Sequence, residues 1–361
     1  MLTCSPIVAA PLGLGFAFCN APDHLQAVPR KGFDAMDGDM RQIVTVDIGG
    51  THARFAVAEL STDGQIALCD VVVLQTREHA SLKSAWAAFA KILGRPLPRA
   101  AGIAIASPVQ GDVLQLTNNP WIIRPSLLQH ELELDCVTLI NDFEAVAHAV
   151  AHAEPHHFQH VQGPTDFPPE GVTTVIGPGS GLGVAALVRA NGRTQVVATE
   201  GGHVDFAPLD TLEDYILARL RKRFRRVSVE RVASGPGLAN ILDALASFEG
   251  QAVPLRTDKE LWQVALAGTD SLSAAALDRF CMILGAVAGD TALVQGANRV
   301  VIAGGVGLRL KDYLGRSGFG HRFTAKGRFE TMMKSITVEV ITHPQAGLFG
   351  AAAAFSTEQH N

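Results

Sequence analysis

The sequence has few cysteines, and they are not spaced for a metal site or a disulfide framework. The 361 residues include no CxxC pair, and the five cysteines are scattered at Cys4, Cys19, Cys69, Cys136 and Cys281. This spacing argues against a zinc knuckle and against a fold held together by disulfides. It is typical of a chain that stays reduced, so we expect a cytoplasmic location.

Excess positive charge and a basic leader are also missing. The formal net charge is -5, which gives no overall attraction to nucleic acid or to an anionic membrane. The apolar segment 7–19 has no Lys or Arg before it, contains Pro11 and is too short to span a bilayer. We therefore expect no signal peptide, no membrane partner and no nucleic-acid partner. Residues 1–42 precede the patterned chain and are expected to form a poorly ordered extension.

From Ile43 onward, strand-like and helix-like segments alternate, which is typical of an α/β protein. With 47% hydrophobic residues, the chain is long enough for two domains with separate cores. A layout of strand, glycine turn and strand occurs twice, which suggests a duplicated architecture with a site between the halves. We expect strands at 43–48, 53–60, 69–76, 101–107, 137–142, 172–177, 184–188 and from 298, and helices at 81–93, 212–224, 277–293 and 344–355.

Three glycine-rich turns follow strands, at Gly49–Gly50, Gly177–Gly183 and Gly304–Gly307. Glycine lets the backbone approach a ligand and aim N–H groups at it, which suits phosphate. A Walker A loop is excluded because no Gly-Lys pair occurs in the chain. The segment GPGSGLG lacks GxGxxG spacing and leads into a strand, so it does not fit a dinucleotide fingerprint. The pattern therefore predicts nucleotide phosphates held between β-hairpins.

Asp47 directly precedes the first glycine turn, and Thr51 directly follows it. A carboxylate would repel a phosphate, but it can hold Mg²⁺ that lies between them, through water. The alternative is that Asp47 only ends the strand and shapes the turn. The sequence leaves both interpretations open.

Polar residues with the chemistry of a polyol site occur at three further places. Asn141 and Asp142 end a predicted parallel strand, where Asp142 can cap the next helix or accept a proton from a substrate hydroxyl. Glu200 and His203 flank two glycines and can form a turn or bind sugar hydroxyls. Glu230 stands beside Arg231 before another glycine turn, where the alternative is a surface ion pair.

Five histidines crowd into thirteen residues, from His148 to His160. His148 and His152 would share a helix face and could chelate a metal. No carboxylate or cysteine completes the set at helical spacing, and Pro155 ends the helix. We expect a polar helix face here. The basic end of the helix at 212–224 is likewise expected to be a solvated helix end.

In chain order, several segments resemble the bacterial ATP-dependent glucokinase family. They are VDIGGTHARFAVAEL, LTNNPW, LINDFEAVAHA, GPGSGLGV, TEGGHVDFAP, VERVASGPGLANI, VVIAGGVGLRL and QAGLFGAAAA. The resemblance covers about 43–356 and implies a two-domain actin/hexokinase-like (ribonuclease H-like) fold with the active site in the interdomain cleft. The implied small domain is 43–152 plus 343–361, the implied large domain is 153–342, and the implied assembly is a homodimer.

The same resemblance implies a role for each matching residue. Asp142 takes the position of the general base, Asp47 orients Mg²⁺ through water, and the substrates are D-glucose and ATP. Two departures from many relatives are His52 in place of Asn and Ser180 in place of Thr. The implied sugar-binding residues are Asn118, Asn141, Asp142, Glu200, His203 and Glu230, and the implied ATP-binding residues are Val46, Asp47, Ile48, Gly49, Gly50, Thr51, Gly179, Ser180, Gly181, Gly304 and Gly305.

Three other functions compete with transfer of the γ-phosphoryl of Mg-ATP to O6 of glucose. One is a kinase for another hexose or one that uses polyphosphate. Another is a non-catalytic sugar- or nucleotide-binding regulator, which the carboxylate at Asp142 and the lack of a helix-turn-helix segment before the first glycine turn disfavour. The third is an actin-like filament or chaperone ATPase, which would not need Asn141, Glu200, His203 and Glu230 together.

Overall fold

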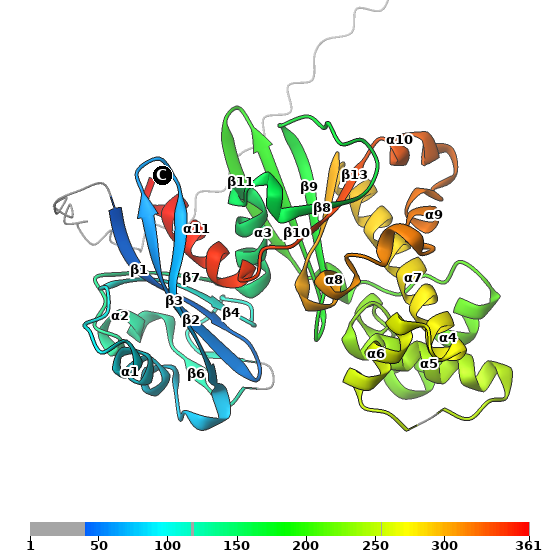
Figure 1. The fold of residues 1–361 in the computed structure, drawn as a ribbon, viewed down its shortest axis with the longest axis horizontal. Helices are drawn as coiled ribbons and strands as arrows, with labels where there is room; N and C mark the ends of the chain where they lie inside the picture. The colour runs from blue at the N-terminus through cyan, green and yellow to red at the C-terminus, as the bar shows by residue number, and fades with distance from the viewer. Residues whose placement is uncertain (1–39, 117–118, 254, 361) are drawn as a thin grey trace, which may run out of the picture. The chain divides into compact units, whose positions relative to one another are not determined.

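Two β-sheets carry the fold, as the alternating pattern predicts (Figure 1). The computed structural model describes residues 40–116, 119–253 and 255–360. Within these residues, the first sheet has the order β3-β2-β1-β4-β7 and the second has the order β11-β10-β9-β12-β13-β8. The first contains β1 (Met40–Ile48), β2 (His52–Ser61), β3 (Ile66–Gln75), β4 (Ala100–Ile105) and β7 (Cys136–Asn141). The second contains β8 (Phe158–Gln162), β9 (Gly171–Pro178), β10 (Leu182–Ala190), β11 (Arg193–Thr199), β12 (Arg299–Ile302) and β13 (Thr337–Ile341).

The first sheet brings two distant polar segments to the same edge. Strands β1, β4 and β7 run parallel, so their carboxyl ends meet at one edge of the sheet. Their register places Ile48, Ile105 and Asn141 in one row. The apolar run that begins at Ile43 forms the interior of this sheet and is almost wholly buried. The turn after β1 and the start of the helix after β7 are therefore neighbours.

The second sheet repeats this layout with its own glycine turn. Strands β9 and β10 form an antiparallel hairpin in which Gly177 pairs with Gly183 and Pro178 with Leu182. Strand β12 runs parallel to β9, with Ile302 beside Ile176. The segment that follows β12 therefore reaches the same end of the sheet as the tip of the hairpin.

Helices α3 (Asp142–His152) and α11 (Ala346–His360) pack against each other, and α11 also covers β1, β4 and β7. The hydroxyl of Thr45 in β1 donates a hydrogen bond of 2.7 Å to the Leu348 carbonyl of α11. The small residues that the sequence places in α11 allow this close packing, and Ala351 to Ala354 are buried. Helix α3 also contacts β10 and β11 of the second sheet.

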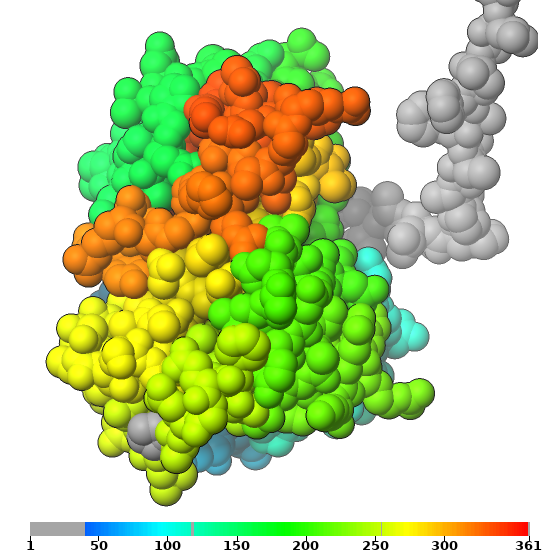
Figure 2. All heavy atoms as spheres, turned by 90° about the vertical axis from the view of Figure 1, so that its right-hand side faces the viewer, coloured from blue at the N-terminus to red at the C-terminus, as the bar shows by residue number. Residues whose placement is uncertain are grey.

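Most of the remaining helices gather beside the second sheet, as Figures 1 and 2 show. In Figure 2 the green and yellow segments that contain α4 to α6 lie below the orange segment that contains α9 and α10. Helices α1 (Leu82–Leu93) and α2 (Leu128–Glu131) lie beside the first sheet. The others are α4 (Thr211–Phe224), α5 (Gly235–Glu249), α6 (Asp258–Ala267), α7 (Ser271–Gln295), α8 (Gly304–Leu310), α9 (Phe319–Thr324) and α10 (Glu330–Lys334).

Helix α7 is the buried core helix that the all-round apolar segment predicts. Among the described residues it is the one helix that is long and apolar enough to cross a membrane by length and composition. In the structure, 72% of its most apolar window is buried, and Phe280, Cys281 and Leu284 are fully enclosed. This burial is what a core helix shows.

Several predicted boundaries are wrong, including the start of α7, which lies at Ser271 and not at Leu277. Strand β1 begins at Met40, not at Ile43, because the polar residues Arg41 and Gln42 still pair with β2. Strand β3 begins three residues earlier than expected, at Ile66. The segment Gly304–Leu310 is helix α8, not a glycine turn. The division into a small domain and a large domain stays a prediction, since residues 40–361 form one compact unit.

Candidate functional site

The turn between β1 and β2 is held from several sides. The Gly49 N–H donates to the His52 carbonyl at 2.9 Å and closes the turn. The Asn119 amide donates to the Gly49 carbonyl at 3.1 Å, and the Thr76 hydroxyl donates to the Gly50 carbonyl at 3.0 Å. Sequence reasoning missed Asn119 and Thr76, which are far from the turn along the chain. These hydrogen bonds fix the turn from both strands and from two distant segments.

Asp47 is paired across this hairpin with an arginine that sequence reasoning missed. An Arg54 guanidinium nitrogen lies 2.9 Å from a carboxylate oxygen of Asp47, whose side chain is 16% exposed. The two residues are cross-strand partners in the β1–β2 ladder. Burial raises the pKa of Asp47, and Arg54 opposes this rise. The signal was present in the sequence, because a hairpin that turns at Gly49 to His52 necessarily places residue 54 opposite residue 47.

Asn141, not Asp142, caps helix α3. The Asn141 side-chain oxygen accepts hydrogen bonds from the N–H groups of Phe143 at 2.8 Å and Glu144 at 3.3 Å. Its amide nitrogen donates to the Ser107 carbonyl at 3.2 Å. The interpretation of Asp142 as the cap is therefore wrong. Both residue types are good caps, and the extended backbone of Asn141 decides between them. Asp142 becomes the first helical residue, and its carboxylate is free of the capping role.

Asp142 has a strongly perturbed carboxylate. Burial and, after it, the carboxylate of Asp47 raise the pKa of Asp142 to about 6. The backbone N–H of Phe143 acts in the opposite direction, and Glu200 adds a smaller rise. These interactions show that Asp47 from β1, Asp142 from α3 and Glu200 from the segment after β11 lie within one another's electrostatic field. A carboxylate with a pKa about one unit below neutrality is ionised at pH 7 and can still accept a proton.

The second glycine hairpin is tied to Glu230 of η5 (Val229–Arg231). The Leu182 N–H donates to the Glu230 carboxylate at 3.1 Å, and the same carboxylate fills the space that a side chain at Gly181 would need. The tip is closed by a bond of 2.8 Å from the Gly179 N–H to the Gly181 carbonyl. The alternative of a surface ion pair with Arg231 is wrong, because the Arg231 guanidinium lies over the Phe224 ring instead.

Glu200 precedes the short helix η4 (Gly201–His203), and His203 is its last residue. Helix η4 packs against β10. The His203 ring nitrogen lies 3.9 Å from the Glu200 carboxylate, and both side chains are more than half exposed. An Arg226 nitrogen donates to the His203 carbonyl at 2.7 Å and fixes the end of this segment. Helices η4 and η5 also contact each other, so the segment stands beside Glu230.

The third glycine segment meets the second. Gly304 has a φ of +75°, in the left-handed region that favours glycine. A Cβ at this position would lie 2.6 Å from the Pro178 carbonyl oxygen of the second hairpin. Gly304 and Gly305 are therefore at the start of α8, next to the hairpin of β9 and β10. A side chain at Gly305 would meet open space.

The sequence is similar to known proteins over most of its length. A family model described as Glucokinase matches residues 44–358. The glucokinase of Zymomonas mobilis subsp. mobilis is 59% identical over 318 residues, which cover 88% of this chain and 98% of that protein. The chain belongs to the glucokinase family.

Solved structures confirm the expected fold class. The glucokinase from an Antarctic psychrotroph superposes with a TM-score of 0.77 at 30% identity and covers 88% of this chain and 99% of its own. A ROK family glucokinase from Streptomyces griseus, in complex with glucose and AMPPNP, gives a TM-score of 0.58 at 19% identity, with 87% and 99% covered. At that identity the second likeness shows the fold alone.

The other predicted ATP-binding residues of this glucokinase-family chain differ in how exposed they are. Val46 and Ile48 are fully buried in β1, so their side chains belong to the core of the first sheet and are not exposed to a ligand. Thr51 and Ser180 are exposed at the tips of the two hairpins, and the Thr51 hydroxyl lies 2.9 Å from the His52 ring. Asn118 lies outside the described residues, and its role stays a prediction.

The two histidines of α3 differ in how exposed they are to solvent. His148 and His152 do share a helix face, with ring centroids 6.4 Å apart. His152 is exposed, whereas burial lowers the pKa of His148 to about 4, so the expectation of a solvated polar face is wrong for His148. The basic end of α4 is also less solvated than expected, because Arg219 binds Asp243 with nitrogen–oxygen distances of 2.7 and 3.0 Å.

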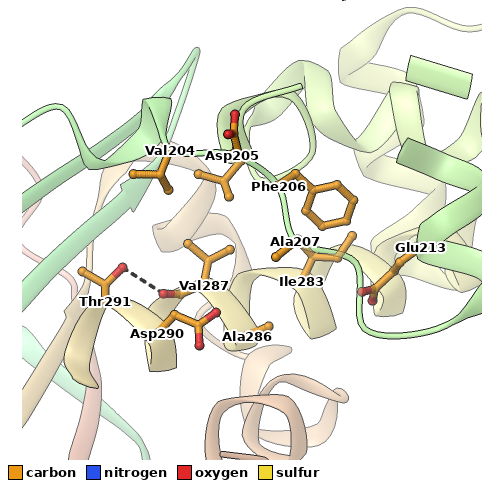
Figure 3. A pocket seen from close by; sticks show the side chains of 11 residues that line it. Val204, Asp205, Phe206, Ala207, Glu213, Ile283, Ala286, Val287, Asp290 and Thr291 are labelled. Carbon is orange, nitrogen blue, oxygen red and sulfur yellow. Dashed lines mark hydrogen bonds between the residues drawn. The ribbon is translucent and has the colours of Figure 1, made fainter. Parts of the chain in front are cut away.

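A separate small cavity of about 70 Å³ lies between the segment 204–207 and helix α7 (Figure 3). Its carboxylates are already paired, since Glu213 binds Arg279 and Arg322, and Asp290 binds Lys326. The rest of its lining is mainly aliphatic and aromatic, and none of the predicted glucokinase site residues lines it. The cavity is not the candidate active site.

Proposed function

We propose that this protein transfers the γ-phosphoryl group of Mg-ATP to O6 of D-glucose and gives glucose 6-phosphate and ADP. Membership of the glucokinase family supports this activity. The observation that carries the proposal is the surroundings of Asp142: burial and the carboxylates of Asp47 and Glu200 raise its pKa to about 6, and the next residue, Phe143, lies on the second glycine hairpin. The Z. mobilis relative, which is named glucokinase and is 59% identical, supports the choice of glucose.

In the proposed reaction, Asp142 accepts the proton of the glucose O6 hydroxyl. The O6 oxygen forms a bond to the γ-phosphorus, the bond between that phosphorus and the β–γ bridging oxygen breaks, and ADP leaves. Phosphoryl transfer depends on positioning and on neutralising charge more than on covalent chemistry. A base that is already desolvated and fixed on the first helical turn loses little by reorganising during the reaction.

The two glycine hairpins hold the nucleotide in this proposal. The tips at Gly49–Thr51 and Gly179–Gly181 offer backbone N–H groups to the phosphates, and Gly304 and Gly305 approach the adenosine side. Rigid bonding of both tips fixes the γ-phosphoryl relative to Asp142.

The residues around Asp47 fit Mg²⁺ held through water. Asp47 and Asp142 offer carboxylate oxygens, which Mg²⁺ prefers, and their mutual repulsion would be relieved by a cation. Among the described residues, no group of three acidic, cysteine or histidine side chains is placed to hold a metal ion directly. Asp47 would therefore act through water while the phosphates supply other ligands. When bound, Mg²⁺ neutralises the charge that develops on the phosphate oxygens.

Glu200, His203 and Glu230 bind the sugar hydroxyls in this proposal. Glu200 and His203 are exposed next to the hairpin and available to a ligand. Asn141 is also proposed to contact the sugar, although its amide is already used for the helix cap and the Ser107 carbonyl. A sugar that lacks a matching hydroxyl would leave a buried polar group unpaired, which costs about 1–3 kcal/mol.

The experiment that tests this proposal measures sugar-6-phosphate formation over a panel of hexoses and phosphoryl donors. We expect glucose with Mg-ATP to give the highest kcat/KM. A higher value with another hexose or with polyphosphate would replace glucose or ATP in the proposal. ATP hydrolysis that no sugar stimulates would contradict a sugar kinase.

Assembly and location are proposed on the resemblance and the cysteine pattern. We propose a homodimer in the cytoplasm, where the enzyme would feed glucose 6-phosphate into glycolysis. Light scattering of the purified full chain should give twice the mass of 38.2 kDa. A monomer at micromolar concentration would contradict the dimer.

A further inference from the structure

Two glycines of the second hairpin have no conformational need to be glycine. Gly177 and Gly183 are direct cross-strand partners in the β9–β10 ladder. Neither Gly177 nor Gly183 has a positive φ, so any residue could adopt their backbone conformation. Glycine inside a strand weakens the strand and usually marks a place where something approaches closely. These two positions therefore need another explanation.

The ring of Phe143 supplies that explanation. A Cβ built on Gly183 would overlap the Phe143 ring, and all three of its nearest atoms belong to that ring. A Cβ built on Gly177 would lie 2.5 Å from the same ring. The pair of glycines leaves a flat patch on the hairpin, and the aromatic ring lies across both. This contact joins α3, which follows the first sheet, to the second sheet.

Phe143 also stands in direct contact with the catalytic end of α3. It follows Asp142 in the chain, its N–H donates to the Asn141 cap at 2.8 Å, and the same backbone group interacts with the Asp142 carboxylate. A shift of the ring would therefore move the first turn of the helix and the carboxylate with it. The ring's glycine partners lie only two residues from the hairpin tip, Gly179–Gly181.

We propose that Phe143 is a positioning residue, whose ring on the Gly177–Gly183 patch sets the placement of the Asp142 carboxylate relative to the second phosphate hairpin. This inference rests on the proposed role of Asp142. Misplacement of a reacting group by about 1 Å can cost on the order of 100-fold in rate. The effect should fall on kcat, because neither the sugar-binding nor the nucleotide-binding groups change.

The first test is Phe143→Ala, with Val146→Ala as the matched control on the same helix. Val146 is also a partly buried apolar residue of α3, but it does not occupy the glycine patch. We expect Phe143→Ala to lower kcat by roughly 10- to 100-fold, with the KM values for glucose and ATP changed by less than about threefold. The control should keep kcat within about threefold. If Phe143→Ala does not fold, Phe143→Leu serves in the same comparison.

The second test is a double-variant rescue. Gly183→Ala alone should lower kcat, because the new methyl group displaces the ring. In the Phe143→Ala background the same change should cost less than about twofold, since the ring is gone. Gly183 is preferred to Gly177 for this purpose because a Cβ at Gly177 would also meet the backbone of Ala303 at 3.1 Å. Strictly additive effects of the two changes would overturn the proposal.

The pH dependence separates positioning from loss of stability. Removal of the ring should admit water to the Asp142 carboxylate and move the acidic limb of the kcat profile to lower pH. A Phe143→Ala variant with wild-type kcat and an unchanged limb would overturn the positioning role. Asp142→Asn tests the base separately: if it retains turnover, the proposed base is wrong, whereas an inactive Asp142→Asn beside a fully active Phe143→Ala rejects only the role of Phe143.

Discussion

The two glycine hairpins have the same layout but are stabilised by different interactions. The hairpin of β1 and β2 is braced by polar contacts, namely the Asp47–Arg54 pair and hydrogen bonds from Asn119 and Thr76 to its carbonyls. The hairpin of β9 and β10 is braced by packing against the Phe143 ring and by the Glu230 carboxylate. Both turns have a carboxylate beside them, but Asp47 is paired with Arg54, whereas Glu230 accepts from the Leu182 N–H. The second hairpin also has an aromatic ring packed on its strands. We infer that this ring makes the second hairpin important for alignment, and that Asp47 makes the first hairpin important for the metal.

Asp142 is where the two hairpins converge, so its loss should have the largest effect. We expect Asp142→Asn to lower kcat by about two to four orders of magnitude, because the amide cannot accept the O6 proton. The KM for glucose should change much less. A coupled assay at saturating glucose and Mg-ATP measures both parameters. Retention of more than a tenth of the wild-type kcat in a folded variant would remove Asp142 from the role of base.

The charge of the first hairpin is tested by Asp47→Asn. We expect kcat/KM for Mg-ATP to fall by about 10- to 100-fold, the usual range when a group that orients a bound metal is lost. The Mg²⁺ concentration for half-maximal activity should rise, because an amide attracts a hydrated cation less strongly. Titration of Mg²⁺ at fixed ATP provides the measurement. An unchanged Mg²⁺ requirement would favour the alternative in which Asp47 only shapes the turn.

The brace of the second hairpin is tested by comparing two changes at Glu230. Glu230→Gln keeps an oxygen that can accept from the Leu182 N–H, whereas Glu230→Ala leaves that N–H without its partner. We expect both to raise the KM for glucose by roughly tenfold, a loss of about 1.4 kcal/mol in hydrogen bonding to the sugar. Only the alanine variant should also lose about 1–3 kcal/mol of unfolding free energy. Equal stability of the two variants would contradict the bracing role.

The last prediction concerns stability, not activity, at Asp142. Its folded pKa of about 6 lies above the ordinary aspartate value of 3.8, so the folded state prefers the protonated carboxyl. That stabilisation is present below about pH 4 and is lost as the pH rises through about 6. The cost of the ionised form at pH 8 is on the order of 3 kcal/mol. Denaturant unfolding at pH 8 should therefore find Asp142→Asn more stable than the wild type. A less stable variant would contradict the prediction that burial of the ionised Asp142 carboxylate destabilises the folded state.

The sequence predicts most of the strands and the two glycine hairpins, because both depend on local patterns. Apolar runs that end in glycine or in a polar pair correctly locate β1, β7 and β9 and the two hairpins. Even Arg54 could have been found by counting outward from the first turn. The boundary errors at β1 and β3 arise where polar residues continue a ladder that their neighbours determine.

Contacts between distant segments could not be predicted in this way. The Glu230 carboxylate binds the N–H of a residue 48 positions earlier, and Phe143 meets glycines on another sheet. The choice of Asn141 over Asp142 as the cap also depends on backbone geometry that two equally suitable residue types do not specify. The sequence therefore predicts candidate groups for the site, and tertiary packing determines their partners and their burial.

The pH dependence of the rate at glucose and Mg-ATP concentrations far below their KM values tests the central claim most directly, because it reports the protonation of the base in the free enzyme. Under these conditions the rate should fall tenfold for each pH unit below an apparent pKa near 6, the value to which Asp142 is raised. The slower Asp142→Asn variant should lack this limb. A wild-type limb near pH 4, or the same limb in the variant, would contradict the account.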